Sequence, residues 1–156
     1  MVGEMRDLET IQLAISAAET GHLVLSTLQT QSAHKTIDRI VDSFPPNQTP
    51  QIRAMLSESL RGVVSQQLLR RADGKGMALA CELLLSTVSL SNLIRDGKTF
   101  QIPSVLQTGA ALGMKKMDDA ISELLWAGTI TKDEALRMAM IKKDILDKPP
   151  EKKKNA

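Results

Sequence analysis

Two polar side chains stand at the ends of short apolar segments, where a side chain can reach a bound ligand. Glu4 follows Val2 and Gly3, which read as the end of a strand, and His22 opens an apolar run that continues to Leu28. A side chain at the carboxyl end of a parallel strand faces the crevice in which α/β proteins bind ligands. In nucleotide hydrolases an acid there acts on magnesium or on the attacking water. Glu4 is therefore a candidate catalytic residue, with a surface carboxylate as the alternative, and His22 is either functional or simply packed.

Other catalytic and metal-binding patterns are absent from the 156 residues. The phosphate-loop pattern G-x-x-x-x-G-K-[ST] does not occur, and Gly74-Lys75-Gly76 lies in an expected hairpin turn rather than between a strand and a helix. The single cysteine, Cys81, excludes a disulfide framework and a cysteine-based zinc module. The two histidines lie in different expected elements, and no Ser/His/Asp arrangement has a recognisable spacing.

Composition and charge narrow the classes of partner. The net charge is +2, and the segment from Lys142 onward carries +3 of it, so the rest of the chain is slightly acidic. A nucleic-acid-binding domain carries a basic face, and single strands need aromatic platforms, whereas aromatic residues are only 2% here. No run of 18 apolar residues and no signal-peptide pattern occurs. We expect a cytoplasmic protein with no nucleic-acid partner and no membrane insertion.

The elements expected around these residues alternate between strands and helices. Asp7 is a good N-cap for a helix that ends at Gly21, and the run 22–28 suits a strand buried on both faces, which together form a βαβ unit. Helices are expected from Ser32 to Phe44 and from Thr49-Pro50 to about Gly62. A β-hairpin follows, with strands near 63–69 and 77–85 and a loop at 72–76. Beyond Thr87 the pattern is helical, and the last helix opens with a capping box, Thr131 to Glu134.

This order predicts an α/β fold followed by a small helical bundle. The expected boundaries are a mixed α/β part over residues 1–87, a helical domain over 88–146, and a disordered basic tail over 147–156.

Several strings closely resemble one family of motor proteins. Gly3-Glu4-Met5-Arg6-Asp7 matches the family's Walker B segment. The run from Thr20 to Thr30 matches the segment called the His box, and the match continues in the runs 36–45, 56–66 and 112–114. Together they are similar to the bacterial secretion ATPase superfamily, and within it to the type IV pilus retraction (twitching motility) ATPases of the PilT/PilU family. The resemblance implies the C-terminal part of a RecA-like P-loop core.

The resemblance also implies roles for particular residues. Glu4 would be the catalytic residue and would act on magnesium indirectly, while His22 and Gln29 would lie near the phosphates of ATP. Gln29 stands where the family has a histidine; glutamine can donate a hydrogen bond but cannot become cationic. The residues Ser91, Asn92, Leu93, Ile94 and Arg95 match a retraction effector motif, with Ser91 replacing its first arginine. Such motors are homo-hexamers at the inner-membrane base of the pilus, where they work with a platform protein and a related motor ATPase.

Members of this family are about twice as long and carry a Walker A loop, which the present sequence lacks. We therefore expect this chain to be the C-terminal portion of such a motor, without ATPase activity or tight nucleotide binding by itself. ATP and magnesium would belong to the full-length parent. The alternative is a stand-alone, non-enzymatic module that docks on a motor ring through its helical domain. Whether the motor is a primary or an accessory one stays open.

Overall fold

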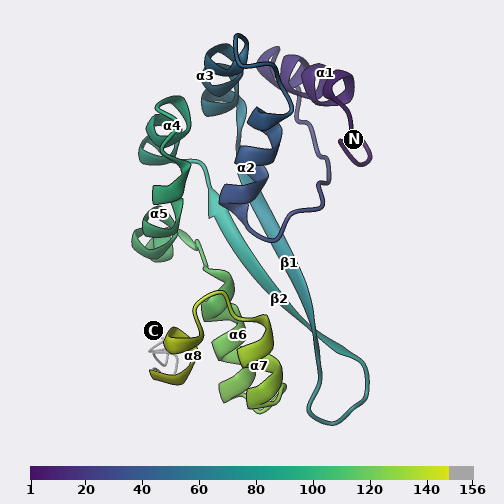
Figure 1. The fold of residues 1–156 in the computed structure, drawn as a ribbon, viewed down its shortest axis with the longest axis vertical. Helices are drawn as coiled ribbons and strands as arrows, with labels where there is room; N and C mark the ends of the chain where they lie inside the picture. The colour runs from purple at the N-terminus through teal and green to yellow at the C-terminus, as the bar shows by residue number, and fades with distance from the viewer. Residues whose placement is uncertain (148–156) are drawn as a thin grey trace.

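A computed structural model describes residues 1–147 as eight α-helices and one two-stranded antiparallel sheet, with two short 3₁₀ turns (Figure 1). The elements are α1 (Leu8–Glu19), α2 (Ala33–Asp42), α3 (Thr49–Ser59), β1 (Gly62–Arg70), β2 (Met77–Leu85), α4 (Val88–Arg95), α5 (Ile102–Thr108), α6 (Met117–Trp126), α7 (Lys132–Met138) and α8 (Lys142–Asp147). The predicted tail begins at the last residue of α8, and its residues 148–156 lie outside the described residues.

The first three helices begin where the sequence predicts. Asp7 caps α1 by accepting a 2.8 Å hydrogen bond from the amide of Thr10, and Gly21 follows the helix with a φ of 93°. Helix α2 buries Ile37, Ile40 and Val41 on one face. Helix α3 has a proline in its first turn, where no backbone N–H donor is needed.

The predicted hairpin is confirmed. Strands β1 and β2 pair from Gly62 opposite Leu85 to Arg70 opposite Met77. The hairpin is long, and Figure 1 shows it running from the α1–α5 end of the molecule to the α6–α8 end.

The hairpin carries two separate apolar cores. The upper core joins α1–α5 to the open end of the hairpin, with Ile37, Leu56, Leu84 and Leu90 at its centre. The lower core joins α6–α8 to the half of the hairpin near its turn, through residues such as Leu69, Met117 and Ile121. After the hairpin, which contributes to both cores, the last buried residue of the upper core is Met114 and the first of the lower core is Met117. The domain boundary near residue 87 stays a prediction.

The segment 22–28 does not form the expected buried strand. Its Thr27 makes one isolated parallel bridge with Glu4, and the amide of Val2 donates to the carbonyl of Leu25 over 2.9 Å. The parallel direction predicted for a βαβ unit is present, but among residues 1–147 only the segment 2–5 pairs with it. As a result Leu23 and Leu25 are 76% and 58% exposed.

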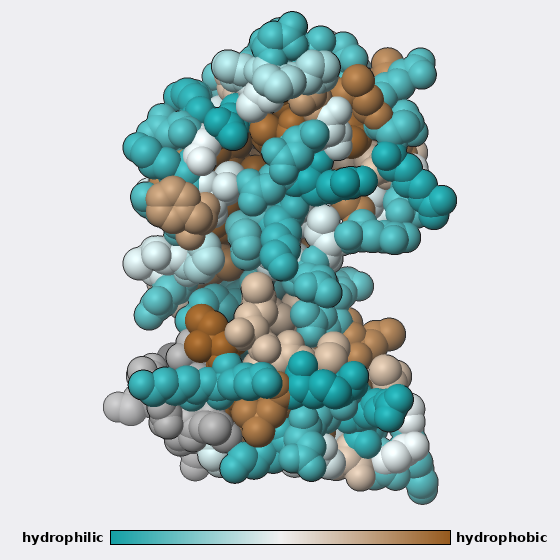
Figure 2. All heavy atoms as spheres, in the orientation of Figure 1, coloured by the Kyte–Doolittle hydropathy of each residue, from teal (hydrophilic) through white to brown (hydrophobic). Residues whose placement is uncertain are grey.

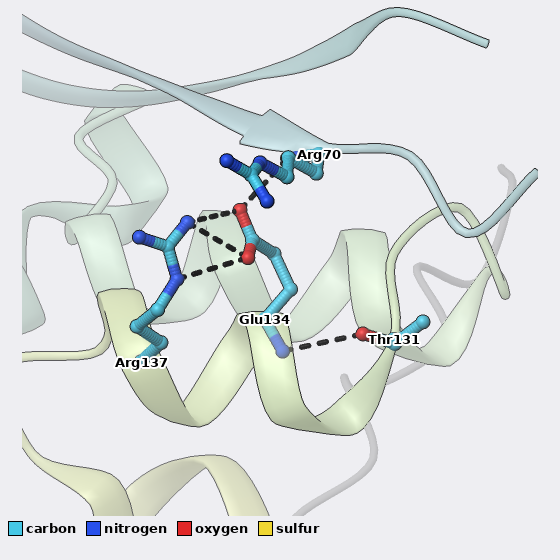
Figure 3. Close-up of polar contacts among 4 residues, drawn as sticks. All are labelled: Arg70, Thr131, Glu134 and Arg137. Carbon is cyan, nitrogen blue, oxygen red and sulfur yellow. Dashed lines mark hydrogen bonds and ion pairs between the residues drawn. The ribbon is translucent and has the colours of Figure 1, made fainter. Parts of the chain in front are cut away.

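Glu134 attaches the lower helices to the hairpin (Figure 3). Its carboxylate accepts a 2.8 Å hydrogen bond from the backbone amide of Arg70 and binds the guanidinium of Arg137. The predicted capping box is thus only half formed: Thr131 Oγ1 accepts from the amide of Glu134, but the glutamate side chain turns to the sheet. No helix in the described part of the chain is long and apolar enough to cross a membrane.

Candidate functional site

A hollow of about 590 Å³ lies beside the parallel bridge at the N-terminal end of the chain. Its lining comes from the segment around Glu4, the segment that leads into α2, and α2 itself. The lining residues are Glu4, Met5, Arg6, Leu28, Gln29 and Arg39, and we call this cavity the Glu4 hollow. A second hollow of about 410 Å³ is lined by Gln29 and Arg39 together with other polar residues of α2 and of the segment before it.

The parallel bridge explains why Glu4 and Gln29 meet. The amide of Met5 donates to the carbonyl of Thr27 over 3.0 Å, which sets the two segments side by side in register. Glu4 is thereby paired with Thr27, two residues before Gln29. Two of the site residues expected from the sequence, Glu4 and Gln29, therefore share one cavity.

Arg6 pairs directly with the candidate catalytic carboxylate. Its Nη2 lies 2.6 Å from Glu4 Oε2, and the hydrogen bond to Glu4 raises the pKa of the Arg6 guanidinium above its ordinary value. The side chain of Glu4 is 27% exposed and that of Arg6 is 74% exposed, so the pair sits at the rim of the hollow in contact with water. An exposed pair of this kind opens at little cost in free energy. Glu4 can therefore exchange Arg6 for another partner.

Arg39 is a candidate site residue that the sequence analysis did not single out. It lies on the exposed side of α2, opposite the buried Ile37, and lines both hollows. Within residues 1–147 its guanidinium makes no ion pair shorter than 4.0 Å. The signal that could have found it is helical phase, because residues opposite a buried stripe face outward.

His22 is not among the residues that line either hollow. It is exposed, and its Nδ1 lies 3.1 Å from Thr20 Oγ1 at the end of α1. The structure thus gives His22 a local partner and does not bring it together with Glu4 and Gln29.

The five residues of the expected effector motif lie on α4 and are divided between surface and core. Asn92 and Arg95 are exposed, and Arg95 Nη2 lies 3.4 Å from Glu58 Oε1 on α3. Ile94 is fully buried, Leu93 packs against the upper core, and Ser91 is half-buried. The motif therefore offers two side chains to a partner while the apolar ones anchor the helix.

The Glu4 hollow combines acceptor and donor groups. Glu4 offers a carboxylate, Gln29 an amide that can both donate and accept, and Arg39 a fork of N–H donors. Donors of this kind bind oxyanions such as phosphate, and a single carboxylate can bind a water of a hydrated magnesium ion. No cluster of three or more His, Cys, Asp or Glu side chains suited to a metal occurs in the described part of the chain.

Comparison with known proteins places these residues in a family. The family model described as Type II/IV secretion system protein matches residues 1–118. The chain is 52% identical over 139 residues to the Twitching motility protein of Neisseria gonorrhoeae, covering 89% of this chain and 37% of that protein. It is 50% identical over 141 residues to the Type IV pilus retractation ATPase PilT of Pseudomonas aeruginosa, covering 90% of this chain and 41% of that one.

A solved structure agrees with the sequence comparison. The crystal structure of the pilus retraction motor PilT with bound ADP superposes with a TM-score of 0.81 at 44% identity, covering 91% of this chain and 39% of that one. The predicted α/β fold of the RecA-like motor type is therefore confirmed. The chain spans about two fifths of the length of these relatives.

Proposed function

The chain belongs to the type II/IV secretion system protein family, and from that premise we propose that it is the C-terminal part of a hexameric ATPase motor that retracts type IV pili. The observation that carries the proposal is the meeting of Glu4 and Gln29 in one hollow, in a chain that is 52% and 50% identical to two twitching motility and pilus retraction proteins. In the whole motor this hollow would lie beside the terminal phosphate of ATP.

Glu4 is proposed as the residue that activates water. Its carboxylate oxygens accept hydrogen bonds, so Glu4 would orient an attacking water and take its proton at Oε1 or Oε2. Its partner Arg6 must then move aside, and its exposed position allows this. Bound ATP and magnesium would supply the phosphoryl group and the charge neutralisation that its transfer needs. Glu4 would meet the magnesium only through water.

Gln29 and Arg39 are proposed as donors to phosphate oxygens. The amide of Gln29 donates a neutral hydrogen bond, and Arg39 can donate two at once to an oxyanion. His22 would reach the phosphate oxygens only if the segment 22–28 changed its conformation, because in this structure its ring pairs with Thr20. Donors fixed before reaction lower the barrier because they need no reorganisation.

The motor context supplies the proposed partners and place of action. Six copies would form a ring at the cytoplasmic side of the inner membrane, peripheral to the pilus base. Asn92 and Arg95, the exposed residues of the effector motif, would face the platform protein or a related motor ATPase. The 156 residues carry no Walker A loop, so we expect no measurable hydrolysis by the chain alone.

A chimera tests the proposal. This chain would replace the matching portion of the gonococcal Twitching motility protein, to which it is 52% identical. We expect a ring with magnesium-dependent ATP turnover that Glu4→Gln abolishes, whereas Glu9→Gln, an exposed carboxylate on α1, leaves turnover unchanged. A folded ring without turnover, or turnover that is indifferent to Glu4→Gln, would contradict the proposal.

The alternative is a module without catalytic activity that docks on a complete motor ring. The lack of a phosphate loop in this sequence favours it. In that case the unaltered chain would bind a preformed ring of the gonococcal protein, and Asn92→Ala with Arg95→Ala would weaken the binding while Glu4→Gln would not.

A further inference from the structure

Glu82 is a buried carboxylate that binds two helices from different cores. Its side chain projects from β2, and the residue is only 4% exposed. Oε1 accepts a 2.7 Å hydrogen bond from the amide of Ala33, the first residue of α2, and Oε2 accepts a 3.3 Å bond from the amide of Met117, the first residue of α6. The positive ends of two helix dipoles therefore point at one negative group.

Glu82 lies in a polar band that separates the two cores. Ser65 is its partner across the hairpin, and Gln67 comes next along the same face of β1. The Ser65 hydroxyl and the Gln67 carbonyl oxygen are buried and have no hydrogen-bond partner in the described part of the protein. In the described part of the chain the buried apolar side chains form two separate clusters, and the Glu82 carboxylate bonds to the first residue of α2 on one side and of α6 on the other.

A path of contacts leads from the first turn of α2 to the Glu4 hollow. Thr36 Oγ1 lies 3.0 Å from the carbonyl of Ser32 and 2.7 Å from Thr30 Oγ1. Thr30 is the neighbour of Gln29, and Arg39 lies two residues beyond Ile37 on α2. A shift of the N-terminus of α2 therefore moves two lining residues of the hollow relative to Glu4.

On the other side, the segment before α6 is bonded to the same part of β2. The amides and carbonyls of Leu83 and Lys115 exchange hydrogen bonds of 2.9 and 3.0 Å. Asp118, one residue after Met117, accepts from the amides of Met140 and Ile141 and so holds the segment before α8. A movement of the α6–α8 unit therefore reaches Met117 directly.

We propose that Glu82 is a positioning residue that couples the α6–α8 unit to the Glu4 hollow. Displacement of α6 changes the hydrogen bond from Met117, the carboxylate shifts, and the N-terminus of α2 follows with Gln29 and Arg39. The meaning of this coupling for turnover rests on the proposed function, but the coupling itself is a property of the chain and can be measured without nucleotide.

The test compares backbone ¹H–¹⁵N resonances of the full chain in four proteins: wild type, Asp118→Asn, Glu82→Gln and the double variant. Asp118→Asn loosens the α6–α8 unit without touching the upper core. We expect it to shift the resonances of Gln29 to Ser32 and of Arg39 in the wild-type background, and to leave them in place in the Glu82→Gln background. Asp119→Asn, an exposed neighbour, is the matched control and should shift none of them.

Shifts of equal size in both backgrounds, or no shift in either, would overturn the proposal.

A second measurement needs no variant and covers the case in which Glu82→Gln does not fold. In the wild-type chain, the amides of Ala33 and Met117 should exchange with solvent through one opening event, with protection factors within about threefold of each other and the same dependence on low denaturant. Independent opening of the two amides would overturn the coupling, whereas the ATPase proposal is tested separately by the chimera.

Discussion

The Oε1 atom of Glu82 accepts a 2.7 Å hydrogen bond from the amide of Ala33, which lies 49 residues earlier in the chain. A carboxylate in the middle of a strand thus accepts the hydrogen bond at the helix N-terminus that a local N-cap side chain usually accepts. Ser32, the residue at the N-cap position of α2, makes no capping bond of its own. The start of α2 therefore depends on a tertiary contact rather than on its own sequence.

Removal of this carboxylate should be costly. Glu82→Ala leaves the buried amides of Ala33 and Met117 without acceptors, and each such loss costs about 1–3 kcal/mol. We expect the free energy of unfolding to fall by about 3 kcal/mol in denaturant titrations. Glu123→Ala, which removes the exposed carboxylate paired with Lys115, should change it by less than about 1 kcal/mol. Similar losses in the two variants would argue against the buried role of Glu82.

Glu134 should make stability depend on acid pH. The side-chain hydrogen bonds from Arg137, and then the amide of Arg70, hold the pKa of Glu134 below its ordinary value. The folded state thus binds a proton less readily than the unfolded state. The stabilisation is complete above the ordinary glutamate pKa of 4.5 and is lost as pH falls through the lower pKa of the folded protein.

Thermal unfolding of the wild type and of Glu134→Gln from pH 7 to pH 3 measures this contribution. The melting temperature of the wild type should fall more steeply below pH 4.5 than that of the variant, because glutamine does not titrate. Asp7 and Asp73, whose pKa values are also lowered, contribute equally to both proteins. Parallel curves would show that Glu134 does not contribute.

Gly97 should resist substitution because of its backbone. Its φ is +71°, a conformation that L side chains rarely adopt, whereas a Cβ there would meet only the flexible guanidinium end of Arg53. Gly113 has a φ of +91° and open space around it, so it serves as a control for backbone strain alone. We expect Gly97→Ala and Gly113→Ala each to cost about 1 kcal/mol in equilibrium unfolding. A much larger cost at Gly97 would mean that Arg53 cannot move aside.

Gln29 should limit turnover in an assembled motor. In the chimera described above, Gln29→His should raise the rate of ATP hydrolysis by roughly 3- to 30-fold, because an imidazole stabilises developing phosphate charge better than a neutral amide. Steady-state hydrolysis rates at saturating ATP measure this, with Gln31→His as a control on a neighbouring exposed residue that lines only the second hollow. An unchanged rate would remove Gln29 from the phosphate site.

Local signals in the sequence predict most elements of the fold. Asp7, Pro50 and the turn at Asp73-Gly74 act within a few residues of their own position, and the structure places helix starts and the hairpin turn accordingly. The pairing of Glu82 with Ala33 and Met117 could not be predicted, because its partners lie 49 and 35 residues away and a glutamate in a strand has no local signature.

The candidate site follows the sequence in part. Glu4 was proposed from a strand end and Gln29 from a family motif, and the parallel bridge brings them to one hollow. Arg39 was missed because a charged residue on a helix is ordinarily solvated and has no motif of its own. The expected burial of Leu23 and Leu25 was wrong because burial depends on neighbouring strands, of which residues 1–147 supply only one short segment.

The polar band between the two cores also determines how the molecule absorbs heat. Figure 2 shows hydrophilic side chains spread over the upper part of the molecule and an outline that narrows between the upper and lower parts. The two cores are held together by the hairpin, the paired hydrogen bonds between Leu83 and Lys115, and the Glu82 carboxylate. In a calorimeter the wild-type chain should therefore melt as one cooperative unit, whereas Glu82→Ala should melt as two, with a van't Hoff enthalpy smaller than the enthalpy measured directly. The carboxylate thereby decides whether the two cores lose their order together or separately.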